Sequence, residues 1–200
     1  MAVAPTVEAV VRAGGEHIPP LMDALEQRLA EQAAGHGEVL ARHGGDTIAA
    51  GGKRLRPLIV FVMCGPPVAS AQEGLVAAAV AVELVHSATL VHDDVLDAAA
   101  LRRGRPTVVA AAGRAIATAS GDLLFARAFS VLAGTGNAAA VRVLSKASTA
   151  LAQGELLQRA DAFRADVAVE RYLLRCELKT ARLFAAACEL GALQATGSSA

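Results

Sequence analysis

An acidic cluster is the part of this sequence with the clearest chemical potential: three aspartates fall within His92-Asp93-Asp94-Val95-Leu96-Asp97. In an α-helix, Asp93 and Asp97 lie on one face, one turn apart, and Asp94 lies about 100° around the helix from Asp93. Acids at this spacing near a helix C-terminus destabilise the helix by roughly 0.2–0.5 kcal/mol. A bound divalent cation reverses that sign, since carboxylates hold Mg²⁺ ions that also bind substrate phosphates. The alternative interpretation is an acidic helix end that faces solvent.

Two basic segments that contain glycine flank this cluster. Arg102-Arg103-Gly104-Arg105 follows it, and a guanidinium group suits phosphate oxygens because it donates two parallel hydrogen bonds. The run Lys53-Arg54-Leu55-Arg56 precedes it, directly after Gly51-Gly52, where a turn into a helix offers backbone N–H groups to an anion. Each segment alone is also compatible with a solvated charged loop. Together with the acids, they predict a divalent metal that holds a di- or triphosphate.

Three further polar residues lie in apolar helical patterns. His86 stands two helical turns before Asp93, on the same face, where it is either a core histidine or a ligand of the anion. Lys179 and Thr180 interrupt the apolar pattern of the last expected helix. A lysine in such a place more often extends its ammonium group to solvent than takes part in chemistry. The residues alone leave both alternatives open.

Composition indicates the kind of fold that must position these residues. Alanine supplies 47 of the 200 residues and aromatic residues supply six, which favours closely packed helices over a β-rich core. We therefore expect an all-α protein with a single domain. The 19 basic and 19 acidic residues give a net charge of zero, which argues against nucleic acid as a partner through bulk charge.

The sequence also indicates where the protein works. No uncharged run reaches the roughly 18 apolar residues of a membrane span, because Cys64-Gly65-Pro66-Pro67 interrupts the longest one. The first eleven residues lack the basic start of a secretory signal. The three cysteines fit neither a disulfide framework nor a zinc site by number and spacing, so we expect buried thiols. We expect a soluble, cytoplasmic protein that does not span a membrane.

Turn and capping residues divide the chain into helices. Ser70 with Glu73 forms a capping box, Asn137 and Asp166 are expected to cap the last two helices, and a break is expected near Gly121-Asp122. With apolar periodicity, these signals predict helical segments over 21–34, 58–64, 70–97, 107–133, 138–165 and 167–193, and a loop over 98–106.

These motifs, in this order, resemble the trans-isoprenyl diphosphate synthases of the polyprenyl synthetase family. The resemblance covers about residues 21–193 and rests on Gly51-Gly52-Lys53-Arg54-Leu55-Arg56-Pro57, the run from Glu83 to Asp97, Arg102-Arg103-Gly104, Gly121-Asp122, Gly154-Glu155 and Lys179-Thr180. It implies an antiparallel helical bundle of the isoprenoid synthase type. Residues 1–200 would form one incomplete domain that lacks the C-terminal part of that bundle.

The resemblance implies a reaction and a role for each site residue. The reaction is the head-to-tail condensation of isopentenyl diphosphate with an allylic prenyl diphosphate. Asp93 and Asp97, supported by Asp94, match the first aspartate-rich motif, which holds Mg²⁺ or Mn²⁺ ions on the allylic diphosphate. The residues matched to the diphosphate of isopentenyl diphosphate are Lys53, Arg56, His86 and Arg103. Those matched to the allylic substrate are Arg102 and Lys179, with Lys179 and Thr180 stabilising the allylic carbocation.

The helix face below the acids is expected to line the tunnel for the growing hydrocarbon chain. In the family, a bulky aromatic residue near this place ends the tunnel early. The corresponding residues are Ala81, Val85, Ala88 and Thr89, and none of them is aromatic. A medium or long product is therefore expected, and Ala88→Phe in an active form of the protein should shorten it.

The sequence departs from the family pattern after Asp166, where these 200 residues contain no further aspartate. The family's second aspartate-rich motif, which faces the first across the cavity, is absent from them. We therefore expect this chain alone to have little or no activity, as a truncated synthase, a subunit completed by a partner chain or a decayed relative. The alternative function is a non-catalytic regulatory subunit of a heteromeric prenyl diphosphate synthase. By analogy with the family, a homodimer is also expected.

Overall fold

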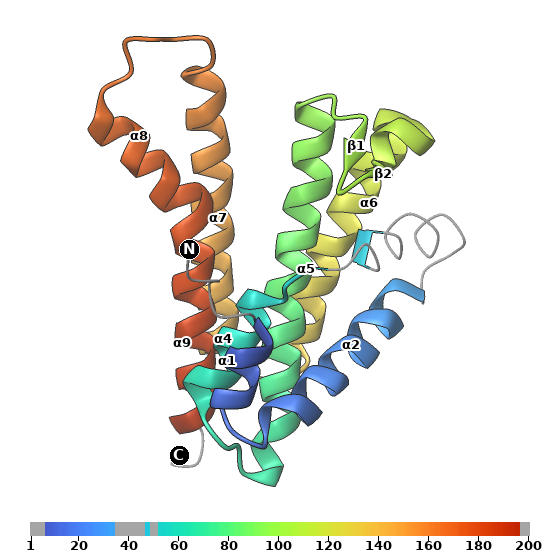
Figure 1. Cartoon of the computed structure of the whole chain (residues 1–200), viewed down its shortest axis with the longest axis vertical. Helices are drawn as coiled ribbons and strands as arrows, with labels where there is room; N and C mark the ends of the chain where they lie inside the picture. Colours follow the sequence, from blue (N-terminus) through green and yellow to red (C-terminus); the bar gives the residue numbers. More distant parts are fainter. Residues whose placement is uncertain (1–6, 35–46, 49–51, 197–200) are drawn as a thin grey trace.

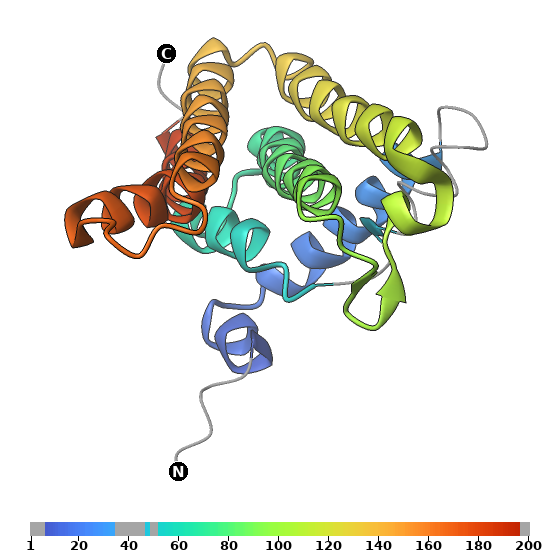
Figure 2. The same cartoon turned by 90° about the horizontal axis from the view of Figure 1, so that it is seen from above.

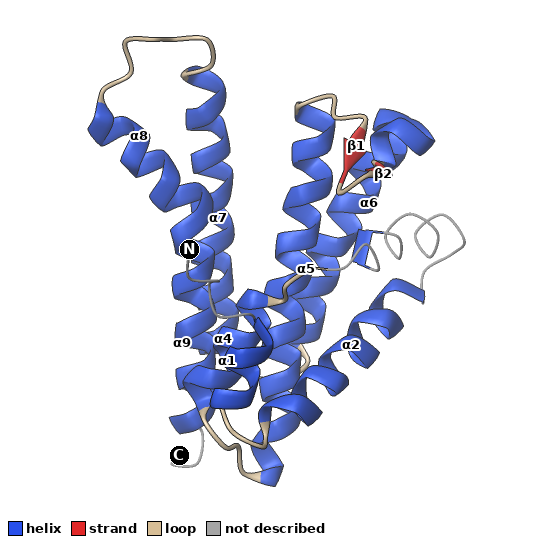
Figure 3. Ribbon diagram, in the orientation of Figure 1, coloured by secondary structure: helices blue, strands red, loops and turns tan. Residues whose placement is uncertain are grey.

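The described residues fold into a bundle of α-helices with a short hairpin (Figure 3). The computed structural model describes residues 7–34, 47–48 and 52–196. The helices are α1 (Val7–Ala13), α2 (Ile18–Ala34), α4 (Leu55–Cys64), α5 (Gln72–Leu96), α6 (Val108–Ala133), α7 (Ala138–Ala160), α8 (Val169–Cys176) and α9 (Arg182–Thr196). The shorter elements are a 3₁₀ turn, η1 (Ala69–Ala71), a π-helical turn, η2 (Glu177–Ala181), and an antiparallel hairpin of β1 (Leu101–Arg102) and β2 (Arg105–Pro106). The all-α prediction is confirmed.

Helix α5 occupies the centre of the molecule. Seen from above, the other long helices surround it (Figure 2), and it packs most extensively against α6, with further contacts to α2, α4 and α9. Small side chains permit this close approach, since residues 77–81 of α5 are buried. Larger side chains fill the spaces between helices, among them the fully buried Phe61 of α4, Leu124 of α6 and Leu190 of α9. Burial of each such side chain stabilises the fold by about 1.5–3 kcal/mol.

Two helical stretches are long and apolar enough to cross a membrane by length and composition alone: Ala69–Leu96 and Val108–Ala133. In Ala69–Leu96, 78% of the apolar window is buried inside the molecule, as in the core helix of a soluble protein. In Val108–Ala133 the buried share is 33%. The central position of α5 therefore explains its apolar sequence without a membrane.

Helix ends follow some of the expected caps and not others. Asn137 caps α7 as predicted, because its side chain accepts a hydrogen bond from the Ala140 backbone N–H. Ser70 does not cap α5: it lies inside η1, and the N-cap of α5 is Ala71, without a side-chain hydrogen bond. Asp166 does not cap the next helix either, since α8 begins at Val169 after Ala168. The Asp166 carboxylate accepts hydrogen bonds from Arg164 instead.

The break predicted in α6 lies at a different glycine. Gly113 has the non-helical angles φ 84° and ψ 168°, whereas the helix runs on through Gly121 and Asp122. Gly121 serves packing: a Cβ atom there would lie 2.3 Å from Nε2 of His92 on α5. Further departures are that α7 ends at Ala160, that η2 interrupts the last predicted helix and that the predicted loop 98–106 contains the β1–β2 hairpin.

Candidate functional site

A cavity of about 640 Å³ lies between α5 and α6 on one side and α7, η2 and α9 on the other. These two groups of helices diverge toward the upper end of the molecule in Figure 1. The apolar part of the cavity wall includes Leu90, Phe125 and Leu151, and its polar rim includes Asp93, Glu155 and Lys179. The remaining lining residues are Arg56, His86, Thr89, His92, Val95, Leu96, Arg114, Thr118, Ser148, Ala152, Leu156, Thr180 and Leu183.

Charged groups from three elements meet at the rim of this cavity. Lys179 Nζ of η2 lies 3.4 Å from Asp93 Oδ2 of α5 and donates a short hydrogen bond to Glu155 Oε2 of α7. Arg159 Nη2, one turn further along α7, donates to Asp97 Oδ1 at 2.6 Å, and Arg159 Nε donates to Glu155 Oε1 at 2.7 Å. Burial raises the pKa of Asp93 above its ordinary value, although the nearby Lys179 ammonium offsets part of this increase. Acid and base thus alternate along this rim.

Glu155 and Arg159 were not predicted as site residues. The sequence offered one signal for Glu155, its place in the matched Gly154-Glu155 motif, and none for Arg159. Gly154 explains how η2 comes close enough, because a Cβ atom there would lie 2.7 Å from the backbone N of Lys179. Such a distance to backbone atoms excludes any larger residue unless η2 moves. The π-helical turn and Gly154 together carry Lys179 to the acids.

Asp94 does not join Asp93 and Asp97. Its side chain is buried and accepts hydrogen bonds from Arg102 Nε at 2.9 and 3.0 Å, and Arg102 Nη2 lies 2.8 Å from Asp94 Oδ1. The hydrogen bond to Asp94 raises the pKa of Arg102. The pair ties the β1–β2 hairpin to the end of α5. Arg102 is not among the lining residues of this cavity, and Arg103 lines a second one, described below.

The two acids fit the chemistry of Mg²⁺. Within the described ranges, His, Cys, Asp and Glu side chains form no cluster of three or more that is ready to hold a metal ion. Mg²⁺ does not require one, since it usually binds one or two carboxylates together with waters and substrate phosphates. Asp93 supplies carboxylate oxygens at the cavity rim, and Asp97, which pairs with Arg159, follows one helical turn later at the end of α5.

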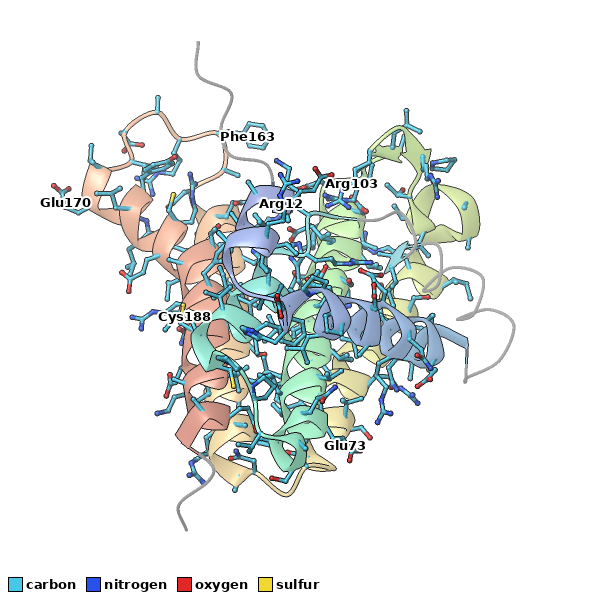
Figure 4. All side chains as sticks on the ribbon, turned by 60° about the horizontal axis from the view of Figure 1, so that its bottom comes forward. Arg12, Glu73, Arg103, Phe163, Glu170 and Cys188 are labelled. Atoms are coloured by element: carbon cyan, nitrogen blue, oxygen red, sulfur yellow. The ribbon has the colours of Figure 1, made fainter. Side chains whose placement is uncertain are left out.

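A second, cationic cavity of about 440 Å³ adjoins the first. Its lining residues are Gly52, Lys53, Arg54, Leu55, Arg56, Glu83, His86 and Arg103. Arg56 and His86 line both cavities. The Arg103 side chain approaches from the hairpin side, close to Gly52, and Figure 4 labels this arginine beside the end of α5. Gly51 of the predicted anion-binding turn lies outside the described residues.

His86 is neutral at physiological pH in this setting. Burial lowers its pKa to about 4, helped by the positive charges of Arg56, Arg103, Arg102 and Arg54. Burial also lowers the pKa of Arg56, whose guanidinium lies 4.3 Å from the ring centroid of Phe184. A neutral imidazole surrounded by four guanidinium groups offers one hydrogen-bond donor and one acceptor to an anion without adding charge.

The structure divides the predicted tunnel residues into two sets. Thr89 lines the first cavity, on the same face of α5 as His86 and Asp93. Ala81, Val85 and Ala88 are completely buried and are not among its lining residues. Lining residues from α6 and α7, such as Phe125 and Ser148, were missed because only α5 was considered. Thr180 lines the same cavity, as expected for a residue next to Lys179.

A family model and several named relatives are similar to this chain in sequence. The sequence model of the polyprenyl synthetase family matches residues 38–200. Component 2 of heptaprenyl diphosphate synthase from Geobacillus stearothermophilus is 46% identical over 149 residues, which cover 74% of this chain and 46% of that protein. Octaprenyl diphosphate synthase from Escherichia coli strain K12 is 34% identical over 174 residues, which cover 87% of this chain and 54% of that protein.

Solved structures show the same similarity. The crystal structure of polyprenyl synthase from Caulobacter crescentus CB15, complexed with calcium and isoprenyl diphosphate, superposes with a TM-score of 0.85 at 34% identity. The superposition covers 98% of this chain and 58% of that one. This chain therefore spans about half the length of the relatives it matches.

Proposed function

This chain belongs to the polyprenyl synthetase family, and from that membership we propose that it acts in head-to-tail prenyl transfer. In that reaction, isopentenyl diphosphate condenses with an allylic prenyl diphosphate. The observation that carries the proposal is the pair of adjoining cavities, one apolar with an acidic and basic rim, the other cationic. An allylic diphosphate needs an apolar wall and a charged rim, and a second diphosphate needs cations beside it.

The side chains divide the work between the two substrates. We assign the diphosphate of isopentenyl diphosphate to Lys53, Arg56, His86 and Arg103, and that of the allylic substrate to Arg102 and Lys179. Mg²⁺ or Mn²⁺ held by Asp93 and Asp97 would neutralise the charge that develops on the leaving diphosphate. Lys179 adds a positive charge at the same rim, and the apolar wall excludes water from the allylic cation.

The bonds change as follows. The C1–O bond of the allylic diphosphate breaks, and its electron pair leaves with diphosphate. The isopentenyl double bond then attacks C1, so that a new carbon–carbon bond forms at C4 of isopentenyl diphosphate. A proton lost from the resulting cation restores a double bond. Backbone and hydroxyl oxygens of Lys179 and Thr180 are assigned to stabilise the allylic cation. We expect a medium or long product because the α5 residue that lines the cavity one turn before Asp93 is Thr89, which is not aromatic.

A crossed pair of variants tests this assignment. Lys53→Gln should weaken isopentenyl diphosphate in calorimetric titration and leave the Mg²⁺-dependent affinity for an allylic diphosphate within twofold of wild type. Asp93→Asn should do the reverse. A wild-type chain that binds neither compound, or variants that lose both affinities together while keeping wild-type thermal stability, would contradict the proposed function.

A second reading is that the chain is a non-catalytic subunit of a heteromeric prenyl diphosphate synthase. It is favoured by the 46% identity to a protein named as component 2 of a synthase. Incubation with both diphosphates and Mg²⁺ discriminates the two readings, because a catalytic chain forms prenyl product and a non-catalytic one only binds.

We also propose that a second copy of the chain, or a related chain, covers α6 in the cytoplasm. The outward face of α6 exposes a run of small residues, including Ala111, Ala115 and Ala119, within a helix apolar enough to be mistaken for a membrane span. Light scattering coupled to gel filtration measures the assembly. Ala115→Glu should convert a dimer to monomers, whereas a wild-type monomer would contradict this arrangement.

A further inference from the structure

Arg54 is the most buried basic residue of the Lys53-Arg54-Leu55-Arg56 run. Its backbone is in the left-handed region, with φ 45° and ψ 36°, directly before α4. Its side chain is only 8% exposed, whereas Lys53 is exposed. Left-handed conformations are costly for residues other than glycine and persist only where surrounding contacts hold them. The contacts of the Arg54 side chain therefore hold this backbone conformation.

Hydrogen bonds from this guanidinium reach three separate parts of the fold. Nη1 donates to Glu83 Oε1 of α5 at 2.9 Å, and Nη2 donates to the Ile48 carbonyl at 2.9 Å. Nε and Nη2 donate to the two carboxylate oxygens of Glu26 on α2, at 2.7 and 3.2 Å. Burial lowers the pKa of Arg54, but hydrogen bonds to Glu26 and Glu83 more than offset this, so that its pKa is raised. Arg54 links the start of α4 to α2 and α5.

Glu83 is the other half of this link, and its location is electrostatically unusual. It is buried, and it is the one carboxylate among the residues that line the cationic cavity. A negative charge beside an anion-binding cavity opposes the anion by Coulomb repulsion. Its presence there is accounted for by the ion pair with Arg54, because the other acid on this buried guanidinium, Glu26, is half-exposed and its charge is screened by solvent.

We infer that Arg54 and Glu83 are positioning residues: their buried ion pair holds the Lys53–Arg56 turn so that Lys53 and Arg56 converge on one diphosphate. The inference rests on the proposed function for the identity of that diphosphate, isopentenyl diphosphate. Lys53 and Arg56 bind the ligand, whereas Arg54 and Glu83 act through them. Arg56 follows Arg54 by two residues, so any movement of the left-handed residue shifts Arg56 directly.

Whether Glu83→Gln tightens or weakens the binding of isopentenyl diphosphate distinguishes a positioning role from a purely electrostatic one. If Glu83 acts only through its charge, Glu83→Gln removes repulsion and tightens binding of isopentenyl diphosphate. If it holds the turn through Arg54, the same substitution weakens binding by about tenfold, or roughly 1.4 kcal/mol. Tighter or unchanged binding by this variant would overturn the inference.

A charge-neutral double variant makes the test independent of net charge. Arg54→Asn with Glu83→Gln removes one positive and one negative charge together, so neither member of this buried ion pair is left without the other and the fold should survive. Asparagine also tolerates the left-handed backbone. We expect calorimetric affinity for isopentenyl diphosphate to fall about tenfold, and the Mg²⁺-dependent affinity for an allylic diphosphate to stay within twofold of wild type. Wild-type affinity for isopentenyl diphosphate in this variant would overturn the inference.

Two further measurements complete the design. The matched control is Arg28→Asn with Glu31→Gln, which removes an exposed ion pair of the same charge type on α2 and should change neither affinity. If the buried double variant melts far below wild type, Arg54→Lys replaces it, because lysine keeps the charge but lacks the fork that reaches two acids. Arg54→Lys should then bind isopentenyl diphosphate three- to fivefold more weakly, and wild-type affinity would overturn the inference. Failure of the wild-type chain to bind isopentenyl diphosphate is a different result, which removes the proposed function and this inference with it.

Discussion

At the scale of single residues, neighbouring groups change the chemistry that a sequence suggests. His86 is the clearest case. Its ordinary pKa is 6.5, and burial together with four arginines lowers it to about 4. In the unfolded chain the histidine binds a proton between these two values, whereas in the folded chain it stays neutral. Folding therefore becomes less favourable as the pH falls from about 6.5 toward 4.

This shift predicts a pH dependence of stability that one substitution removes. Between pH 7 and pH 5, the free energy of unfolding of the wild-type chain should fall by up to about 2 kcal/mol through His86 alone, at about 1.4 kcal/mol for each pH unit below 6.5. His86→Gln should lack this part of the decrease. Urea denaturation of both proteins at the two pH values measures the difference, and parallel decreases in both would contradict the assignment.

Adjacent aspartates of the acid motif should respond in opposite ways to loss of charge. Asp94 is buried and paired with Arg102, so Asp94→Asn should lower the free energy of unfolding by roughly 1–3 kcal/mol. Burial raises the pKa of Asp93, which means that its charged form is disfavoured in the fold. Asp93→Asn should therefore leave stability unchanged or raise it, while abolishing Mg²⁺-dependent binding of an allylic diphosphate. Chemical denaturation and calorimetry of the same two variants test both statements, and equal destabilisation would refute them.

At the scale of helices, the sequence predicted which segments are helical better than it predicted what their glycines do. Glycine in a helix marks either a break or a close approach of a neighbour, and a single sequence does not distinguish the two. Gly121 was predicted to break α6, yet it makes room for His92, and the break lies at Gly113. The acids at 93 and 97 were recognisable because they lie on one helix. Arg159 was not, because its contact with Asp97 joins residues 62 positions apart.

Gly154 offers a test of how one helix positions another. Gly154→Ala places a Cβ atom 2.7 Å from the Lys179 backbone N, so η2 must move away from α7. We expect a loss of about 1–3 kcal/mol in the free energy of unfolding and a roughly tenfold weaker Mg²⁺-dependent binding of an allylic diphosphate. Gly74→Ala is the matched control on α5, where the Cβ atom meets only the flexible end of Gln194. An unchanged affinity in Gly154→Ala would show that Lys179 does not depend on this contact.

The face that α5 turns toward the cavity decides which residue limits the bound hydrocarbon chain. Thr89 lines the cavity and Ala88 does not, so the aromatic substitution belongs at Thr89. Thr89→Phe should weaken a twenty-carbon allylic diphosphate by about tenfold and a ten-carbon one by less than threefold, because the ring fills the deeper part of the cavity. Thr149→Phe on an exposed part of α7 is the control. Equal losses of affinity for both ligands would mean that Thr89 does not lie on the path of the bound hydrocarbon chain. The prediction for Ala88→Phe is tested separately, by the length of the product.

At the scale of the whole molecule, the bundle was predictable from the sequence because its signals agree. The alanine-rich composition, the cap at Asn137 and the matched motifs all favour helices. The relative placement of the helices was available only through the family resemblance. Local periodicity gives the face of a helix, whereas the pairing of faces depends on contacts between distant residues, such as Arg127 of α6 with Gln32 of α2.

The placement of the cavity predicts a response of the entire fold to its ligands. Residues from α4, α5, α6, α7, η2 and α9 line it, so a bound ligand contacts both groups of helices and must be lost when they separate. At a concentration one hundred times its dissociation constant, a ligand that binds only the folded chain adds about 2.7 kcal/mol to stability. For a chain of this size that corresponds to a rise of roughly 5–10 °C in melting temperature. An allylic diphosphate with Mg²⁺ should produce this rise, and addition of a chelator should reverse it.

The contribution of the acid motif to this response can be separated from that of the cations. Asp93→Asn should melt at or above the wild-type temperature without ligand, yet show little further rise with Mg²⁺ and the allylic diphosphate. Isopentenyl diphosphate, which is assigned to the neighbouring cationic cavity, should still stabilise the same variant without metal. An equal rise for wild type and Asp93→Asn with the allylic compound would mean that its diphosphate is held by cations alone. The two-cavity arrangement therefore makes the metal requirement a property of one substrate, measurable by melting curves of one variant.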